Sequence, residues 1–347
     1  MTVSIVERST LKMGEKIGDG GEGEVYLVTN KPSDVFKVFK DAVRSELNES
    51  GLASTIGLLE LMSPADRAFI ASRAAWPHTL VQDKGSFGGF LMPLLPSDYF
   101  CLHGGKGSPI EGMNDWNKLT FRKAWMNNPN LESNSPALWY PSGKDIDSLN
   151  ATEKKKRISL LKLLKDLSQV FEILHKHNIV VGDVSGRNIL WSRQNGDSVM
   201  LIDCDGCRID KTVGVTKAKQ SPEWFDPHLN GPTNIESDLY KLAIAIYRGY
   251  FSDSLGKPEH NSVSLVSNAD REIQRLSLRG VGQSARPTAS EWVNALSNLI
   301  TESENDGRPV IVFDKSGPHS SANPSPSGRP QTPTDVPRPL DDWRNKA

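Results

Sequence analysis

Three polar residues in the second half of the sequence have the types and spacing of a metal-dependent site. Asp183 is followed five residues later by Asn188, and fifteen residues after that comes Asp203. Apolar pairs at 189–190 and 201–202 flank them, so the polar residues are expected on two loops beside buried segments. Oxygen ligands of this kind suit magnesium, and magnesium-assisted phosphoryl transfer requires them beside a phosphate cradle. An interpretation as solvated turn residues leaves the apolar flanks unexplained.

A glycine-rich run near the N-terminus is a candidate phosphate cradle. Gly18, Gly20 and Gly23 precede Val25 in the sequence GDGGEGEVY. Glycine lets backbone N–H groups approach a polyphosphate closely, and the valine can then lie on a base ring. A dinucleotide-binding fold would require a helix directly after the glycines, whereas strand-type sequence follows. Lys37, twelve residues after Val25, is the candidate ligand of the α and β phosphates. Without the other motifs it would be interpreted as an ordinary edge-strand lysine.

The elements that must position these residues change in type along the chain. Strand-type runs at 24–28 and 35–39 predict a hairpin-rich sheet. From Glu153 to His177 leucines recur every three or four residues, which predicts a long core helix, and Asn150 with Glu153 resembles a capping box. Further helices are expected at 44–62, 64–74, 236–251 and 288–301. The pattern is α+β, with a β-rich first lobe and a mainly helical second lobe.

In this order the motifs resemble those of the protein kinase superfamily. The runs VGDVSGRN and LIDCDG resemble its HRDxxxxN and DFG segments, and residues 89–95 are similar to its fifth strand and hinge. Residues 286–289 resemble its RPTA segment, and either 221–223 or 226–228 stands where its APE motif would close the activation segment. The resemblance covers residues 14–300. It looks closest to a bacterial subgroup of kinase-like proteins linked to stress and tellurite-resistance gene clusters.

The resemblance implies a role for each candidate residue. Asp183 would be the base that orients the acceptor hydroxyl, Asn188 and Asp203 would hold Mg²⁺, and Arg187 would neutralise the γ-phosphate of ATP. The expected nucleotide site comprises Gly18, Gly20, Gly23, Val25, Lys37, Met92, Pro93, Leu95 and Leu190, with Glu49 or Glu60 paired with Lys37.

The sequence departs from the family pattern at three places. Val181 and Gly182 replace the His-Arg pair before the catalytic aspartate, so no arginine there can bind a phosphorylated activation loop. Cys204 and Asp205 replace the Phe and Gly of DFG. Phe36 is expected where a small alanine usually faces adenine, which would narrow the nucleotide pocket.

The function that the resemblance implies is ATP- and Mg²⁺-dependent transfer of the γ-phosphoryl group to a protein, with serine or threonine as the expected acceptor. Two alternatives stay open. One is a small-molecule phosphotransferase, whose HGDxxxxN loop also has glycine before aspartate. The other is a pseudokinase that binds nucleotide and signals by conformation. The presence of Lys37, Asp183, Asn188 and Asp203 argues against this alternative.

Charge and composition restrict the expected partners. With 41 Lys+Arg against 42 Asp+Glu the formal net charge is −1, so there is no general positive field for nucleic acid or an anionic membrane. No run of about 18 apolar residues occurs, the first residues lack the apolar core of a secretory signal, and only three cysteines are present. We therefore expect a cytoplasmic protein that binds neither nucleic acid nor a membrane directly, and the resemblance implies a protein substrate.

Composition also predicts the division of the chain. Residues 1–95 are expected to form the N-lobe, and 96–301 the C-lobe with an irregular insertion at about 96–150. Eight of the 22 prolines fall after residue 300, so 302–347 is predicted to be a disordered tail. Its Ser-Pro and Thr-Pro pairs at 325–326 and 332–333 make it a candidate for autophosphorylation.

Overall fold

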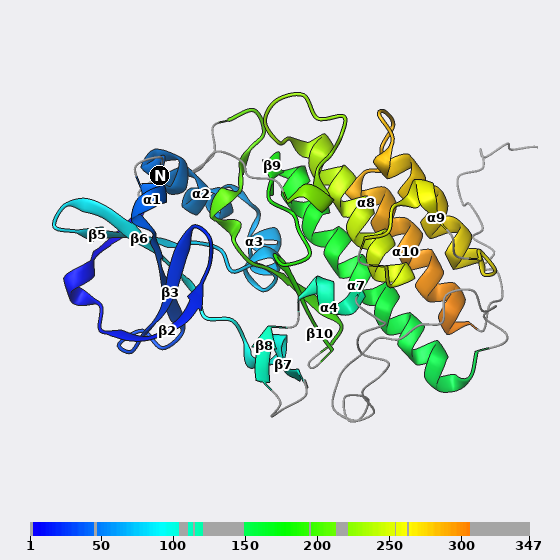
Figure 1. Cartoon of the computed structure of the whole chain (residues 1–347), viewed down its shortest axis with the longest axis horizontal. Helices are drawn as coiled ribbons and strands as arrows, with labels where there is room; N and C mark the ends of the chain where they lie inside the picture. Colours follow the sequence, from blue (N-terminus) through cyan, green and yellow to red (C-terminus); the bar gives the residue numbers. More distant parts are fainter. Residues whose placement is uncertain are drawn as a thin grey trace, which may run out of the picture. The chain divides into compact units, whose positions relative to one another are not determined.

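The structure is a computed structural model of the chain. It describes residues 3–305 except for 45–46, 104–109, 114, 121–148, 194–195, 213–220, 254 and 262–263. Most of the predicted insertion and nearly all of the predicted tail therefore lie outside the described residues. The two-lobed α+β architecture is confirmed, with a six-stranded sheet in the N-terminal part and a helical C-terminal part (Figure 1).

The sheet of the first lobe has the strand order β1-β5-β6-β4-β3-β2. All neighbouring strands are antiparallel except β1 and β5, which are parallel. The strands are β1 (Ser4–Glu7), β2 (Met13–Asp19), β3 (Gly23–Val28), β4 (Asp34–Phe39), β5 (Thr79–Asp83) and β6 (Ser86–Pro93). The runs predicted at 24–28 and 35–39 are confirmed as β3 and β4.

The register of the sheet places Lys37 and Phe36 on opposite faces. Lys37 lies opposite Val25 on β3 and Phe90 on β6, so these three side chains share one face. Phe36 projects from the other face, where it is fully buried in a cluster that includes Leu91. The expectation that Phe36 narrows the nucleotide pocket is therefore wrong, because neighbouring residues of a strand alternate between faces.

Two helical segments follow β4 along the chain. The helix predicted over 44–62 is divided into α1 (Asp41–Arg44), α2 (Glu49–Gly57) and the 3-10 turn η2 (Leu58–Leu61), while the helix predicted over 64–74 is α3 (Pro64–Ala71). Leu52 and Ile56 of α2 pack on the sheet face of Lys37, in a cluster with Phe39, Leu80 and Phe90.

Four long helices make up most of the second lobe. They are α7 (Ala151–Lys176), α8 (Ile235–Phe251), α9 (Asn268–Val281) and α10 (Ala289–Glu304), and they pack side by side in one hydrophobic core (Figure 1). The capping box predicted for α7 is present, because Asn150 Oδ1 accepts from Glu153 N and Glu153 Oε2 accepts from Asn150 N. Every residue from Ser237 to Phe251 of α8 is buried. In the part of the chain that the structure describes, no helix has the length and apolar character needed to cross a membrane.

Short elements connect the helices and carry the polar motifs. The hairpin of β10 (Ile189–Ser192) and β11 (Ser198–Leu201) pairs Ile189 with Leu201, one residue from each of the two apolar pairs. The others are η1 (Arg8–Thr10), η3 (Ser97–Tyr99), β7 (Phe100–His103), β8 (Ile110–Met113), α4 (Trp116–Thr120), β9 (Ile179–Val180), η5 (Cys204–Gly206), β12 (Arg208–Ile209), η6 (Pro222–Trp224) and η7 (Pro258–His260).

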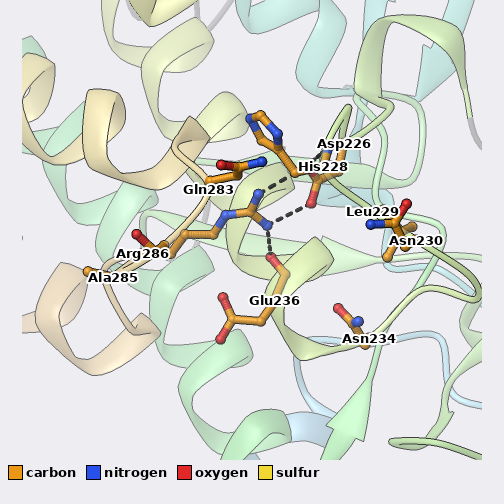
Figure 2. Close-up of a pocket in the computed structure, with 10 residues that line it drawn as sticks. Asp226, His228, Leu229, Asn230, Asn234, Glu236, Gln283, Ala285 and Arg286 are labelled. Atoms are coloured by element: carbon orange, nitrogen blue, oxygen red, sulfur yellow. Dashed lines mark hydrogen bonds and ion pairs between the residues drawn. The ribbon is translucent and has the colours of Figure 1, made fainter.

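A buried ion pair joins the segment before α8 to the segment before α10. The two oxygens of Asp226 accept from Nη1 and Nη2 of Arg286 at 2.6 and 3.0 Å, and the two side chains are 2% and 3% exposed. Figure 2 shows that Arg286 also points to Glu236, whose backbone oxygen accepts at 2.6 Å. Of the two sequence positions considered for the end of the activation segment, 226–228 is therefore the one tied to the Arg-Pro-Thr-Ala segment.

We expect Asp226→Ala to lower the free energy of unfolding by about 3–5 kcal/mol, because it leaves the guanidinium of Arg286 buried without its counter-charge. Urea denaturation measures the change. The matched control is Glu272→Ala, which removes the partner of Arg275 from a pair in which Arg275 is 56% exposed, and which should cost about 1 kcal/mol or less. Equal losses in the two variants would contradict the expected effect of burial.

Candidate active site

Helix α8 supports the loop that carries Asp183 through hydrogen bonds. Asp238 accepts hydrogen bonds from two successive backbone N–H groups, Val181 N at 2.7 Å and Gly182 N at 3.0 Å. One helical turn later, Lys241 Nζ donates to the oxygen of Gly182 at 2.6 Å. Both α8 residues are fully buried. Charge-assisted bonds to buried groups are strong, so the backbone on the N-terminal side of Asp183 is rigidly held.

The glycine that precedes Asp183 is required by its surroundings. Gly182 has φ +80°, and a Cβ there would lie 3.1 Å from both Arg208 Nη1 and Thr233 Oγ1. The guanidinium of Arg208 bonds to Thr233 Oγ1 at 2.7 Å, to the oxygen of Thr233 and, through Nε, to the oxygen of Thr212 at 3.1 Å. Arg208 therefore joins β12 to the segment before α8 in the space that a side chain at 182 would need.

The structure brings Asp183, Asn188 and Asp203 to one place. Asn188 Nδ2 donates to the backbone oxygen of Asp183 at 2.9 Å and to its Oδ2 at 3.1 Å. On the other side, Ile202 N donates to the oxygen of Asn188 at 3.0 Å, so the residue before Asp203 is bonded to Asn188. The sequence-predicted spacing is thus realised by two loops at one end of the β10–β11 hairpin.

The electrostatic surroundings of Asp183 favour its protonated form relative to a free carboxylate. Desolvation by the surrounding protein raises the pKa of Asp183, although the carboxylate stays accessible to solvent. The charge of Lys241 and the hydrogen bond from Asn188 act in the opposite direction, and the charge of Asp203 adds to the increase.

Lys37 joins the sheet to the loop that carries Asp203. Its ammonium lies 3.0 Å from Asp203 Oδ1 and 3.0 and 3.1 Å from the two oxygens of Asp205. Lys37 is 5% exposed, and its Nζ lies 5.6 Å from the ring centres of Phe39 and Phe90. Burial alone would lower the pKa of Lys37, but the carboxylates of Asp205 and Asp203 outweigh burial and raise it above its ordinary value.

Neither candidate glutamate is the partner of Lys37. Glu49 is exposed at the start of α2, and Glu60 in η2 pairs with Arg67 at 2.9 Å. The inward face of α2 presents Leu52 and Ile56 instead. The expected Lys–Glu pair is therefore replaced in this structure by a Lys–Asp pair.

The glycine run forms the turn between β2 and β3. Gly20 N donates to the oxygen of Gly23 at 2.9 Å. A Cβ at Gly23 would lie 2.6 Å from the oxygen of Val38, so only glycine fits there. Gly18 pairs with Val25 in the register of β2 and β3, and Val25 pairs with Lys37. The predicted cradle and the predicted lysine therefore lie on adjoining strands.

The remaining predicted nucleotide contacts gather where β6 ends. Met92 and Pro93 are the last residues of β6, and Met92 packs with the cluster beneath Lys37. Leu95 packs against Leu190 on β10. Three of these four residues lie at or just after the end of β6 and the fourth lies on β10, and all four are apolar, as the predicted contacts with a base would require.

Arg187 lines a pocket beside the loop that carries Asp183. The pocket is bounded by Ser185, Gly186 and Arg187 of that loop and by residues 221–224 before α8. Arg187 is exposed. The pocket also includes Leu255, which is 68% exposed, so this side of the loop combines cationic and apolar surface.

Three residues of the site are not predicted from the sequence. Asp205 departs from the family pattern, and an acid two residues after Asp203 is its visible signal in the sequence. Asp238 and Lys241 were within a helix expected from its periodicity, and their i, i+3 spacing places them on one face. No local sequence signal indicated which loop that face would support.

The donor set fits magnesium. Asp203 supplies a carboxylate whose side chain is 52% exposed, and Asn188 supplies an amide oxygen, since its nitrogen donates to Asp183. Mg²⁺ prefers oxygen ligands, usually takes one or two carboxylates from the protein, and keeps several waters. Among the described residues no cluster of three or more His, Cys, Asp or Glu has metal-binding geometry, and the buried Cys204 and Cys207 pack in the hydrophobic core.

Comparison with known proteins finds weak similarity to kinases. No family model matches the chain. The protein named Protein kinase YegI from Escherichia coli strain K12 is 23% identical over 278 residues, which cover 76% of this chain and 34% of that protein. Its counterpart from Escherichia coli O157:H7 is 21% identical over 277 residues, with 75% and 34% covered.

The chain spans about a third of the length of these curated relatives. The similarity nevertheless runs over three quarters of the chain, and the fold has the two lobes, the strand lysine and the paired loops that the motifs predict. Together the weak similarity to these protein kinases and the two-lobed α+β fold support a protein-kinase-like assignment of the chain.

Proposed function

We propose that this protein is an ATP-dependent protein kinase that transfers the γ-phosphoryl group to a serine or threonine hydroxyl. The observation that carries the proposal is the contact between Lys37 and Asp203 at 3.0 Å, which joins a strand lysine next to the glycine turn to the loop bonded to Asn188. A phosphate-binding cation and magnesium ligands thereby meet beside a candidate base, Asp183.

Each residue then has one task. Asp183 accepts the proton of the acceptor hydroxyl, whose oxygen forms a bond to the γ-phosphorus as the bond from that phosphorus to the ADP oxygen breaks. Lys37 binds phosphate oxygens. The pocket between the Asp183 loop and residues 221–224 is the proposed acceptor pocket, and Arg187, which lines it, would counter the charge of the γ-phosphate. Asn188 and Asp203 would hold Mg²⁺, which supplies neutralisation of the phosphate charge when bound.

The acceptor pocket supports a peptide substrate. It lies between the catalytic loop and residues 221–224, and the exposed Leu255 at its edge offers a surface for an apolar side chain. A cytoplasmic site of action, where ATP is available, belongs to this proposal. The tail after residue 302 stays a candidate for self-labelling, and the tellurite-resistance subgroup stays a prediction from sequence.

A transfer assay with purified protein, radiolabelled ATP and Mg²⁺ tests the proposal. Casein and small-molecule alcohols, such as choline and aminoglycosides, serve as separate acceptors. We expect label on casein, with mass spectrometry locating it on serine or threonine. Label on a small alcohol alone would support a small-molecule phosphotransferase. Nucleotide binding without transfer to any acceptor would support a pseudokinase.

The raised pKa of Asp183 predicts an acidic limit to activity. The base must be ionised, so kcat/KM should fall as the pH is lowered through the pKa of Asp183, which lies above the ordinary carboxyl value of 3.8. Lys241→Met removes a cation that lowers this pKa, so the limit should move to higher pH. Lys162→Met, which removes an exposed partner of Glu304, should leave the profile unchanged; a shift in both variants would contradict this assignment.

A further inference from the structure

The partner of Lys37 comes from an unexpected element. Asp205 lies in η5, two residues after Asp203, and is 6% exposed. Both of its oxygens bond to Lys37 Nζ, at 3.0 and 3.1 Å, whereas Asp203 offers one oxygen and remains half exposed. A buried ammonium needs a counter-charge, and Asp205 is the more buried of the two available carboxylates.

We propose that Asp205 is the positioning residue that holds Lys37 for the nucleotide phosphates, in the place of a glutamate on helix α2. The inference rests on the proposed function, because it assigns Lys37 to ATP. The two carboxylates take different roles because their exposure differs. Asp205 is buried beside Lys37, which leaves the accessible carboxylate of Asp203 for magnesium.

Helix α2 still helps to position Asp205, but through a contact other than a Lys–Glu pair. Thr55 Oγ1 donates to the backbone oxygen of Cys207 at 2.6 Å, immediately after η5, and Trp76 Nε1 donates to the oxygen of Thr55 at 3.0 Å. The helix therefore anchors the end of the turn that carries Asp205. The metal ligand and the partner of Lys37 belong to one short turn, so they are positioned together.

Four variants test the inference: Asp205→Asn, Lys37→Met, the double variant, and Glu60→Gln as the control. Glu60→Gln makes the same change of carboxylate to amide, but its carboxylate pairs with Arg67 at the surface. Isothermal titration with Mg-ATP measures affinity, thermal unfolding measures stability, and the transfer assay separates KM for ATP from kcat.

We expect Asp205→Asn to weaken ATP binding about tenfold or more and to lower the melting temperature, because Lys37 stays buried with a weakened counter-charge. The double variant should bind ATP no more weakly than Lys37→Met alone, and should melt at a higher temperature than Asp205→Asn, since no ammonium is then left poorly paired. Glu60→Gln should match the wild type in affinity, melting temperature and KM.

Additive losses in the double variant would overturn the inference, because they would show that Asp205 acts independently of Lys37. Loss of ATP affinity in Glu60→Gln as large as that in Asp205→Asn would also overturn it. If Asp205→Asn fails to fold, recovery of folding in the double variant supports the pair, and failure of both overturns it. Absence of phosphoryl transfer by the wild type, with the coupling in ATP binding intact, would refute the proposed function and leave the inference standing.

Discussion

Asp203→Asn is expected to abolish phosphoryl transfer while the protein remains folded. The substitution removes the exposed carboxylate that would hold Mg²⁺ and one of the two carboxylates beside Lys37. A metal ion contributes several kcal/mol of charge stabilisation to the transition state, and about 4 kcal/mol corresponds to a loss of about a thousandfold in rate.

Asparagine is the informative replacement at this position. Asp203 has φ +56° and ψ +42°, in the left-handed region that asparagine tolerates and that most other residues avoid. Its side chain is half exposed, so the change leaves no cavity. Asp203→Asn therefore tests the charge without adding backbone strain.

The measurements are the transfer rate, the Mg²⁺ dependence of nucleotide binding, and thermal unfolding. Asp41→Asn is the matched control, because the side chain of Asp41 is 97% exposed on α1 and its loss should change none of the three. Wild-type turnover by Asp203→Asn would show that the metal assignment is wrong.

The variant Asp183→Ala is expected to bind ATP but to transfer almost none of its γ-phosphoryl group. A general base contributes about 10²- to 10⁴-fold to a rate, and orientation of the hydroxyl adds to this effect. The backbone of the loop should survive, because Asp238 holds Val181 and Gly182 and Lys241 holds the oxygen of Gly182. The glycine turn and Lys37, which would contact the nucleotide, do not bond to the Asp183 carboxylate.

Calorimetry with Mg-ATP and a single-turnover transfer assay separate the two effects. Asn188→Ala is the companion variant, since it removes the amide that donates to Asp183 Oδ2 and would also remove a metal ligand. It should weaken Mg-ATP binding as well as transfer. If Asp183→Ala lost nucleotide binding as strongly as Asn188→Ala, Asp183 would be a metal ligand or a structural residue and not the base.

Elements with strong local signals were predictable from the sequence. The apolar spacing and the Asn150–Glu153 capping box placed the start of α7 within two residues of its observed position at Ala151. Helix α9 was missed because its composition is largely polar, although Ala269, Ile273 and Leu276 recur at helical spacing and Ser267 with Asp270 forms a capping box. Strand β1 was missed because its four residues are largely exposed and its pairing partner β5 is more than 70 residues away.

The residue types and their spacing were enough to identify the chemical groups of the site: a glycine-rich run, a strand lysine, one candidate base and two candidate magnesium ligands. These features are local, because each depends on a residue type or on the period of a strand or helix. The sequence could not determine which face Phe36 takes relative to the site until the register of β3, β4 and β6 was known.

Tertiary structure alone selected the partner of Lys37. Glu49, Glu60, Asp203 and Asp205 all carry the required charge, and the resemblance pointed to the glutamates. The choice depends on which carboxylate reaches a buried ammonium across 168 residues of sequence. Packing of Leu52 and Ile56 against the sheet places apolar side chains on that face of α2, and the turn η5 places Asp205 beside Lys37. Long-range packing of this kind leaves no periodic signal in the chain.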